Sequence, residues 1–454
     1  MSTIGQHFYP GDDAVHCNPD RCWRYNCRIL RFLEQQLQET TSLENLPDAL
    51  GKAKRALWWT REHLCYERLA NAMHIRRSLI HHHTRAFNMK KFFTAIEAQC
   101  AVEKICSALT AFLETFSLHI SGLEDRVPQT DIDEDKRTLN SYLGYVLGLC
   151  ACKFDGVPAV VVDEWNGSKQ EHSRQLKAFP PITEDSVDKR EQISLVLRKC
   201  KWKGGTFALK ETAVDDKRDP AQLARAFGEA SCIASCHNSP FVVKFVQITQ
   251  CGNLLLELGD EDLMTWLKRN KPADLKLKLQ FLQQAAAGLA DVHAQGLVHC
   301  NFKDEKLVIF NGRNVKISAL SSLVPSTLAT CTAMIENGGA WWVAPEVFGG
   351  MPHTSGSDIY SFGVVMHVVV AETQPYRGDC SPAAVYDKKM CGQTPCDLPS
   401  TCPGSLVQLM SECCSVDPAR RPPSMNDVGT RLERIMGELA SAGPAVNLNS
   451  IPLQ

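Results

Sequence analysis

The chain has 454 residues, of which 44% are hydrophobic and 22% are charged, and its formal net charge at pH 7 is -2. This composition is typical of a globular protein of two or three domains, and it excludes a disordered acidic chain and a protein that binds nucleic acid through its overall charge. The 20 cysteines include no CxxC pair, so we expect reduced thiols, no metal site and a cytoplasmic protein.

Residues 1–126 are predicted to form an α-helical bundle. Apolar residues recur at helical spacing, as at Leu30, Leu33 and Leu37, and again at Ile105 and Leu109. Several amphipathic helices of this length bury their apolar faces by packing together as a bundle. No run of 18 apolar residues occurs in the chain, which excludes a transmembrane anchor.

Residues 127–189 are predicted to contain a brace helix, at residues 138–152, and then a linker. The segment before this helix, RVPQTDIDEDKR, is acidic and rich in turn-forming residues, which indicates a domain boundary. The segment from residue 164 to residue 192 is polar and contains two adjacent prolines, so we expect an exposed loop there.

Residues 190–437 are predicted to form a domain of two lobes. Short β-prone runs (ISLVL, TFALKE, FVVKFVQI and NLLLEL) come first, and longer helical runs follow from Ala273 onward. Residues 438–454 have no periodicity and are predicted to be a flexible tail. The predicted fold class is therefore α+β, with an N-terminal α-helical bundle followed by a bilobal domain.

Three stretches of the bilobal part occur in a distinctive order: KWKGGTFALK, FGEASCIASCHNSPFVVKF and LLLELGDEDLMTWL. Together they resemble the protein kinase fold, closest to the tyrosine kinase-like group, in which they are the lysine strand, helix αC with its following strand, and the hinge. The resemblance implies a nucleotide pocket formed by the positioning lysine Lys210, its ion-pair partner Glu229, the gatekeeper Leu256 and the hinge residue Glu257.

Later stretches continue the same resemblance. WWVAPEVF, SDIYSFGVV and DPARRPP follow one another at the spacing of the kinase family. The resemblance implies that Arg421 pairs with Glu346, that Asp358 is buried and holds a loop, and that His299 is packed in the core. All four residues are structural rather than catalytic.

The departures from the kinase pattern fall on positions that carry out catalysis or bind the nucleotide in that family. In HCNFKDEKL the resemblance places Asn301 at the catalytic aspartate and Lys306 at the magnesium-binding asparagine, and Ala319 replaces the aspartate of Asp-Phe-Gly. An amide cannot accept a proton at neutral pH, and a general base contributes roughly 10² to 10⁴ in rate. The stretch EQISLVLRKC, at the expected glycine-rich loop, contains no glycine. We therefore predict a pseudokinase with no intact catalytic residue and no cofactor, and binding of ATP without magnesium stays open.

The order of the domains resembles that of the plant mixed lineage kinase domain-like proteins, in which the bundle binds and permeabilises membranes and the pseudokinase restrains it. The stretch IRRSLIHHHTRAFNMKK contains no acidic residue, and each basic residue near an anionic surface contributes about 1 kcal/mol to binding. A solvated helix face, or a dock for the acidic DIDEDK, is the alternative interpretation. The candidate lipid-binding residues are Arg76, Arg77, Arg85, Lys90 and Lys91.

The predicted function is a signalling pseudokinase whose kinase-like domain regulates a helical-bundle effector, with a membrane as one target. Two alternatives stay open: an active atypical serine/threonine kinase that binds ATP, and an interaction scaffold with no membrane activity. The expected partners are signalling proteins, an anionic membrane surface and a second copy of the chain, but not nucleic acid. Recruitment from the cytoplasm to a membrane and phosphorylation of the hydroxyl residues after Ala319 are also left open.

Overall fold

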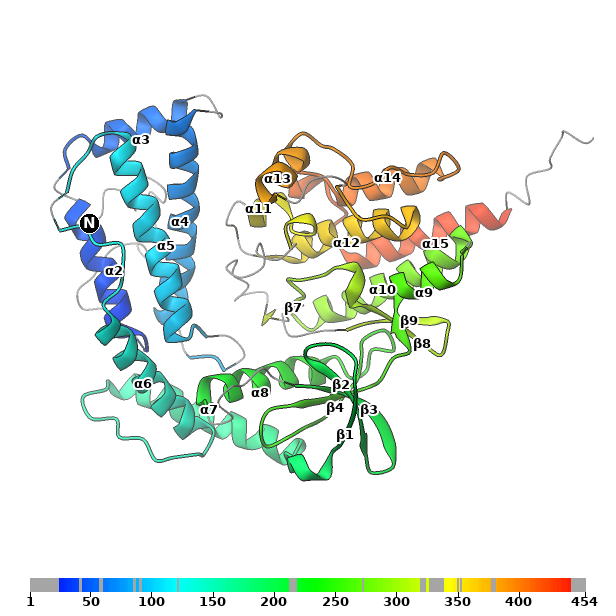
Figure 1. The fold of residues 1–454 in the computed structure, drawn as a ribbon, viewed down its shortest axis with the longest axis horizontal. Coiled ribbons are helices and arrows are strands. Elements are labelled where there is room, and N and C mark those ends of the chain that lie inside the picture. The colour runs from blue at the N-terminus through cyan, green and yellow to red at the C-terminus, as the bar shows by residue number, and fades with distance from the viewer. Residues whose placement is uncertain are drawn as a thin grey trace, which may run out of the picture.

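The structure is a computed structural model, and it describes residues 24–40, 43–56, 60–84, 87–89, 92–120, 122–211, 219–271, 273–318, 324–325, 339–348, 351, 353–376 and 381–441 (Figure 1). The N-terminal region is a bundle in which α5 packs against both α2 and α4, and α3 packs against α4. Its helices are α2 (Cys27–Glu39), α3 (Leu46–Arg55), α4 (Arg61–Thr84) and α5 (Ala95–Thr115).

The bundle core comes from the apolar faces that the spacing predicts. Leu30, Leu33 and Leu37 of α2 are buried. Helix α5 begins with a capping box, in which the Thr94 hydroxyl accepts the Glu97 N–H and the Glu97 carboxylate accepts the Thr94 N–H. Among the helices of the described ranges, none is both long enough and apolar enough to cross a membrane.

Two helices, rather than one helix and a loop, connect the bundle to the second half of the chain. Helix α6 (Gln129–Val146) begins within the acidic segment that was predicted to be a boundary. Helix α7 (Ala159–Ala178) covers much of the segment that was predicted to be a linker, so that prediction was wrong. The reason is that α7 buries only a narrow stripe, Val161, Trp165 and His172, and its other faces are polar enough to look like a loop.

Buried contacts hold α6 and α7 to the bundle. The Asp135 carboxylate on α6 accepts the N–H groups of Arg28 and Ile29, each at 3.0 Å, in the first turn of α2. Such N–H groups have no partner within the helix, so the carboxylate serves as a cap, and burial raises its pKa. Trp165 on α7 is fully buried and stacks on Phe87 at a ring distance of 3.9 Å.

The strand-rich lobe, called the N-lobe below, is an antiparallel five-stranded sheet with the order β1-β2-β3-β5-β4. Helix α8 (Pro220–Ser235) lies between this sheet and helices α6 and α7 (Figure 1). Its N-cap, Asp219, accepts the N–H of Ala221. The strands are β1 (Asp188–Gln192), β2 (Leu197–Trp202), β3 (Gly205–Lys210), β4 (Phe245–Ile248) and β5 (Leu254–Leu256).

The helical lobe, called the C-lobe, is built around α12 (Ser355–Ala371), whose side chains are almost all buried. A small sheet of β6 (Glu261–Asp262), β8 (Leu307–Phe310) and β9 (Asn314–Ile317) faces the N-lobe, and β7 (Leu297–Val298) pairs with β10 (Val324–Pro325). The predicted α+β class, with helices first and a bilobal domain after them, is confirmed. The other helices are α9 (Leu263–Arg269), α10 (Leu275–Ala294), α11 (Pro345–Phe348), α13 (Pro382–Met390), α14 (Gly404–Cys413) and α15 (Met425–Ser441).

Candidate functional site

The cleft side of the N-lobe contains an ion pair between β3 and α8. Lys210 is the last residue of β3, and its Nζ lies 2.6 Å from Glu229 Oε1 on α8. The two side chains are only 16% and 13% exposed, so water screens their attraction less than it does for a surface pair. The structure thus brings together the two residues that the resemblance paired.

The two hinge residues have separate roles. Leu256 is buried on β5, between Ala208 of β3 and Phe245 of β4. Glu257 is turned toward the C-lobe, where one carboxylate oxygen lies 2.5 Å from Nζ of Lys316 on β9 and the other accepts the Lys244 N–H. Glu257 therefore ties the two lobes together.

Asp358 organises the loop that the resemblance assigns to the catalytic loop of kinases. Its carboxylate accepts the N–H groups of His299 at 2.7 Å and Cys300 at 3.0 Å, and it lies 2.9 Å from His293 Nε2. Burial alone would raise the pKa of Asp358, but these contacts hold it below its usual value. Cys300 has a φ of 63°, which is uncommon for a residue with a side chain, and the two hydrogen bonds stabilise that conformation.

His299 lies in the core, as the resemblance implies. Its ring is fully buried and packs edge-on against Phe302. Burial lowers the pKa of His299 to about 4, so the imidazole is neutral at pH 7. A buried neutral ring that supports the loop is consistent with a structural role.

The positions that the resemblance assigns to the catalytic aspartate and the magnesium-binding asparagine hold other side chains. Asn301 is partly exposed, and Lys306 Nζ lies 3.0 Å from Glu305 Oε1, which also binds Lys303 Nζ at 2.6 Å. Burial would raise the pKa of Glu305, but its two lysine partners lower it. A compact cluster of two ammonium groups around one carboxylate therefore stands at the position of the magnesium-binding asparagine.

Some predicted positions cannot be placed. Ala319 lies outside the described residues, and so do the hydroxyl residues considered for phosphorylation, Ser321, Ser322, Ser326, Thr327, Thr330 and Thr332. Within the described ranges, no group of three or more His, Cys, Asp or Glu side chains is arranged to hold a metal ion.

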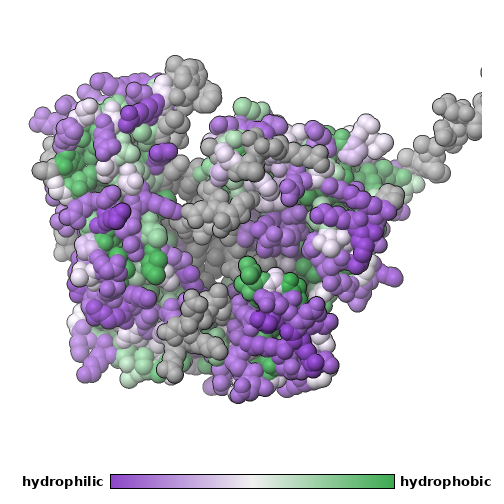
Figure 2. Space-filling model, in the orientation of Figure 1, coloured by the Kyte–Doolittle hydropathy of each residue, from purple (hydrophilic) through white to green (hydrophobic). Residues whose placement is uncertain are grey.

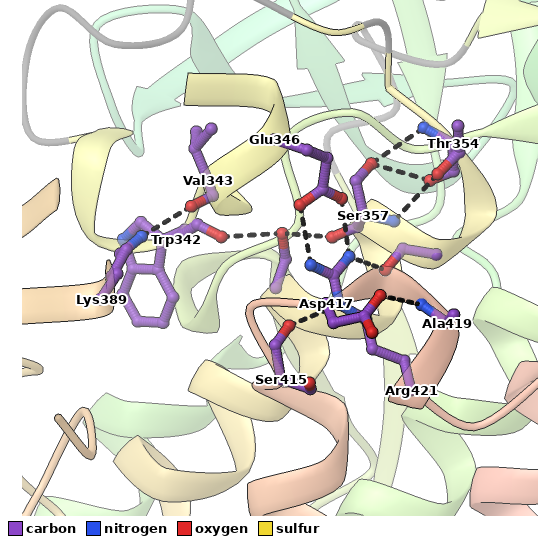
Figure 3. Close-up of polar contacts among 12 residues, drawn as sticks. Trp342, Val343, Glu346, Thr354, Ser357, Lys389, Ser415, Asp417, Ala419 and Arg421 are labelled. Atoms are coloured by element: carbon purple, nitrogen blue, oxygen red, sulfur yellow. Dashed lines mark hydrogen bonds and ion pairs between the residues drawn. The ribbon is translucent and has the colours of Figure 1, made fainter. Parts of the chain in front are cut away.

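Arg421 connects three segments of the C-lobe (Figure 3). Its guanidinium makes a bidentate ion pair with Glu346, at 2.6 and 2.7 Å, and donates to the carbonyls of Ser415 and Gly356 at 2.9 and 3.0 Å. The Arg421 side chain is 1% exposed. This pair, which the resemblance implied, fixes α11 against α12 and the turn before α15.

Lys389 is a second buried cation of this region, and sequence reasoning missed it. It comes from α13, and its Nζ donates to the carbonyls of Ala340 at 2.7 Å and Val343 at 2.6 Å (Figure 3). Burial lowers the pKa of Lys389 to about 7. Only the fold brings these carbonyls to Lys389, so no local pattern could have indicated the contact.

The N-terminal half of α8 binds the helical bundle. Arg225 of α8 makes an ion pair with Glu97, the capping-box residue of α5, and donates to the Phe92 carbonyl at 3.4 Å. Two residues further on, Phe227 packs edge-on against the buried His172 of α7, at a ring distance of 4.8 Å. Sequence reasoning also missed this interface, because each of its residues is unremarkable within its own segment.

The structure describes two of the five candidate lipid-binding residues. Arg77 on α4 is exposed, but Arg76 is 1% exposed, so its predicted place on a lipid-binding surface was wrong. The reason is that adjacent residues of a helix point about 100° apart, so that only one of the two arginines can face solvent when α4 packs against α5. Arg85, Lys90 and Lys91 lie outside the described residues.

Comparison with known proteins identifies the family of the second half of the chain. Residues 192–430 match the model of the protein kinase domain. The chain is similar to serine/threonine/tyrosine-protein kinase HT1 of Arabidopsis thaliana, with 27% identity over 47% of this chain and 53% of the relative. It is also similar to mitogen-activated protein kinase kinase kinase 7 of Drosophila melanogaster, with 32% identity over 40% of this chain and 27% of the relative.

A bacterial relative is similar over a longer stretch. The serine/threonine-protein kinase PknA of Corynebacterium glutamicum is 28% identical over 60% of this chain and 54% of the relative. The chain spans between 16% and 54% of the length of the curated relatives it matches.

Proposed function

The chain belongs to the protein kinase family, and we propose that it is a signalling pseudokinase whose kinase-like domain controls the position of the N-terminal helical bundle. Asn301 and Lys306 support the loss of phosphate transfer, because the Asn301 amide cannot act as a general base and Lys306 puts an ammonium group where the resemblance places a magnesium ligand. The proposed arrangement is that of the plant mixed lineage kinase domain-like proteins.

The observation that carries this proposal is the position of α8 between two partners. Glu229 binds Lys210 in the cleft, and Arg225, one helical turn earlier, binds Glu97 of the bundle. Four helical residues span about 6 Å along the axis, so a shift of α8 that breaks one contact strains the other. A ligand or partner that displaces Glu229 would thereby loosen the bundle.

The coupling is reciprocal, as any coupling free energy between two sites must be. Because Glu97 also caps α5, loss of the Arg225 contact frees the carboxylate without destroying the capping box. The expected response is therefore a change in docking of the bundle, while its helices stay folded.

Hydrogen exchange of the full chain tests the switch. Arg225→Glu should raise exchange in α8 and in the first turn of α5. The double reversal Glu97→Arg with Arg225→Glu should restore protection in α8 only, because Glu97→Arg also removes the carboxylate of the α5 capping box. Arg174→Glu is the matched control, because Arg174 makes an exposed ion pair with Glu171 within α7.

The decisive variant is Glu229→Gln, which changes the contact with Lys210 in the cleft and leaves both Arg225 and Glu97 as they are. If the switch operates, exchange in the first turn of α5 rises in this variant. Exchange that changes only within the N-lobe would show that the two contacts are independent, and would refute the proposal.

The proposed output of the bundle is membrane binding, with protein binding as the alternative. Dye release from anionic liposomes should be low for the wild-type chain, higher for Arg225→Glu, and weaker at high salt, which screens attraction to anionic lipid. If Arg225→Glu raises exchange but neither binds nor permeabilises liposomes, the scaffold function is favoured.

A second candidate function is an active atypical kinase, favoured by the intact Lys210–Glu229 pair. It predicts stabilisation of the chain by ATP only when magnesium is present, and phosphate transfer that Lys210→Met abolishes. The pseudokinase proposal predicts that magnesium does not enhance ATP binding and that no transfer occurs.

A further inference from the structure

An open pocket lies where the connection between α4 and α5 meets α7 and α8 (Figure 1). Its volume is about 390 Å³, which is within the range of pockets that bind small molecules. The visible surface of the N-lobe is mostly hydrophilic (Figure 2), whereas this pocket combines polar groups with the apolar side chains of Phe87 and Met89. We call it the junction pocket.

His172 of α7 gives the junction pocket a buried polar atom without a partner. The residue is 2% exposed and lines the pocket, and in the part of the chain that the structure describes its Nδ1 has no hydrogen-bond partner. Burial lowers the pKa of His172, so the ring is neutral at pH 7. Most buried polar atoms of native proteins have a partner, because an unpaired one costs stability. The unpaired Nδ1 therefore indicates a group that a ligand completes.

Two glycines within helices keep the junction pocket open. Gly167 of α7 and Gly228 of α8 both line it, and a Cβ added at Gly167 would have no atom within 4 Å. Glycine inside a helix is less favourable than alanine, but it lets a ligand approach the backbone closely. Helix stability alone would disfavour both glycines, so their presence fits a binding pocket better than a packed interface.

The polar groups that α7 presents beside His172 mainly accept hydrogen bonds. Ser168, His172 and Gln175 have the spacing i, i+4 and i+7, which places them on one face of the helix. The Ser168 hydroxyl donates to the Glu164 carbonyl at 3.0 Å, so its oxygen is left as an acceptor. The Gln175 amide nitrogen donates to Ser231 Oγ at 3.4 Å, which leaves the amide oxygen. A ligand of this face must therefore bring donors.

The charges at the rim of the junction pocket are already paired. Glu171, which is 52% exposed, lines the pocket, and its carboxylate makes an ion pair with Arg174 and accepts from the Gln175 amide. A ligand therefore needs no net charge, and a carboxylate ligand would meet a second carboxylate. Phe87 and Met89 supply apolar contact for the body of the ligand.

We propose that the junction pocket binds a small, uncharged aromatic molecule that carries a hydrogen-bond donor such as a primary amide or a hydroxyl. Its donor group binds the oxygens of Ser168 and Gln175 and completes the hydrogen bonding of His172 Nδ1. A primary amide or a hydroxyl both donates and accepts, so it suits Nδ1 in either tautomer of the ring. The inference does not rest on the proposed switch.

Two probes of nearly the same shape test the chemistry of the pocket. Benzamide has a donor and benzoate has none, so benzamide should bind the full chain at least tenfold more tightly than benzoate, as measured by saturation-transfer NMR titration. Equal affinities, or no binding of benzamide up to its solubility limit, would overturn the proposal.

Filling the junction pocket tests its location. Gly167→Leu puts a side chain into the open space and keeps a residue that favours helices, so it should weaken benzamide binding at least tenfold. Gly437→Leu is the matched control, because Gly437 is also exposed within a helix, α15, and also has no atom within 4 Å of an added Cβ. Thermal unfolding checks that both variants are folded. Unchanged binding by folded Gly167→Leu would refute the site.

His172→Phe tests the role of Nδ1, because it keeps an aromatic ring and removes the polar atom. Its unfolding temperature should be equal to or higher than that of the wild type, since an unpaired buried polar atom is lost. Its affinity for benzamide should fall at least fivefold. A marked loss of stability would show that Nδ1 already has a partner within the protein, and wild-type affinity would show that Nδ1 does not bind the ligand; either result contradicts the proposal.

Discussion

The buried cations of the C-lobe show how a single side chain can hold several segments together. Arg421 offers a planar set of donors, and its bidentate pair with Glu346 and its two carbonyl contacts use most of them. Lys389 has three donors, and two of them bind carbonyls at the segment before α11. Both residues stabilise the C-lobe and need no substrate to do so.

Arg421→Ala should lower the free energy of unfolding by about 3–5 kcal/mol, because it leaves the Glu346 carboxylate without its partner. The adjacent Arg420, whose side chain is 80% exposed, is the matched control, and Arg420→Ala should change stability by less than about 0.5 kcal/mol. Urea unfolding measures both. Equal effects of the two substitutions would contradict a structural role for the Arg421–Glu346 pair.

His299 makes stability depend on pH. Its pKa is about 4 in the folded chain, against 6.5 for a histidine in water, so between these values the unfolded state binds more protons and stability falls as pH falls. The full effect is roughly 3 kcal/mol. Asp358, Lys306 and His293 act on this ring in the folded state.

His299→Phe removes this titration while keeping an aromatic ring. We expect the difference in unfolding free energy between wild type and variant to change between pH 6.5 and pH 4, in the direction that favours the variant at low pH. A difference that stays constant over this window would show that His299 does not titrate on unfolding.

At the scale of elements, close contacts decide where a helix can accept a side chain in place of glycine. Gly288 in α10 lies so near the N-lobe that an added Cβ would be 2.6 Å from the Phe241 carbonyl oxygen. Gly429 in α15 has only the Ala286 Cβ near it, at 3.9 Å. Both glycines lie within helices, but a side chain would clash at Gly288 and would fit at Gly429.

Gly288→Ala should therefore destabilise the chain by about 1–3 kcal/mol, since the backbone carbonyl must move. Gly429→Ala should stabilise it by about 0.5–1 kcal/mol, because alanine favours the helix and fits the space. Thermal unfolding of both variants measures this contrast. A stabilising Gly288→Ala would mean that α10 is not held against the N-lobe as described.

At the scale of the whole molecule, α6, α7 and α8 join the bundle to the kinase-like lobes (Figure 1). Trp165 is central to this connection, because it is fully buried between Phe87 of the bundle side and Tyr142 of α6. A large aromatic side chain in such a place contributes more than any surface ion pair of the interface.

Trp165→Ala should cost about 3–5 kcal/mol and loosen the bundle from the rest of the chain. Calorimetry should show the transition of the bundle moving to lower temperature, and limited proteolysis should cleave first near α7. Trp202→Ala is the control, because Trp202 packs on Phe207 within the N-lobe. If both variants shift the same transition, Trp165 does not act between the two parts.

The sequence by itself determined the fold class and the identity of the side chains in the segment HCNFKDEKL, residues 299–307. Helical and strand periodicity are local properties, so the order of helices, strand-rich lobe and helix-rich lobe follows from short windows of sequence. The identities of Asn301 and Lys306 likewise decide, without any structure, that no carboxylate stands at the first of these positions and no amide at the second.

Only the tertiary structure decided which polar segments are buried and which charges meet. Helix α7 looks like a linker because its buried stripe is narrow, and Arg76 looks exposed because its sequence neighbours are basic. The Arg225–Glu97 pair joins residues 128 positions apart, and the Arg421–Glu346 pair joins residues 75 positions apart. Such relations depend on how distant elements pack, and no local pattern of residues encodes them.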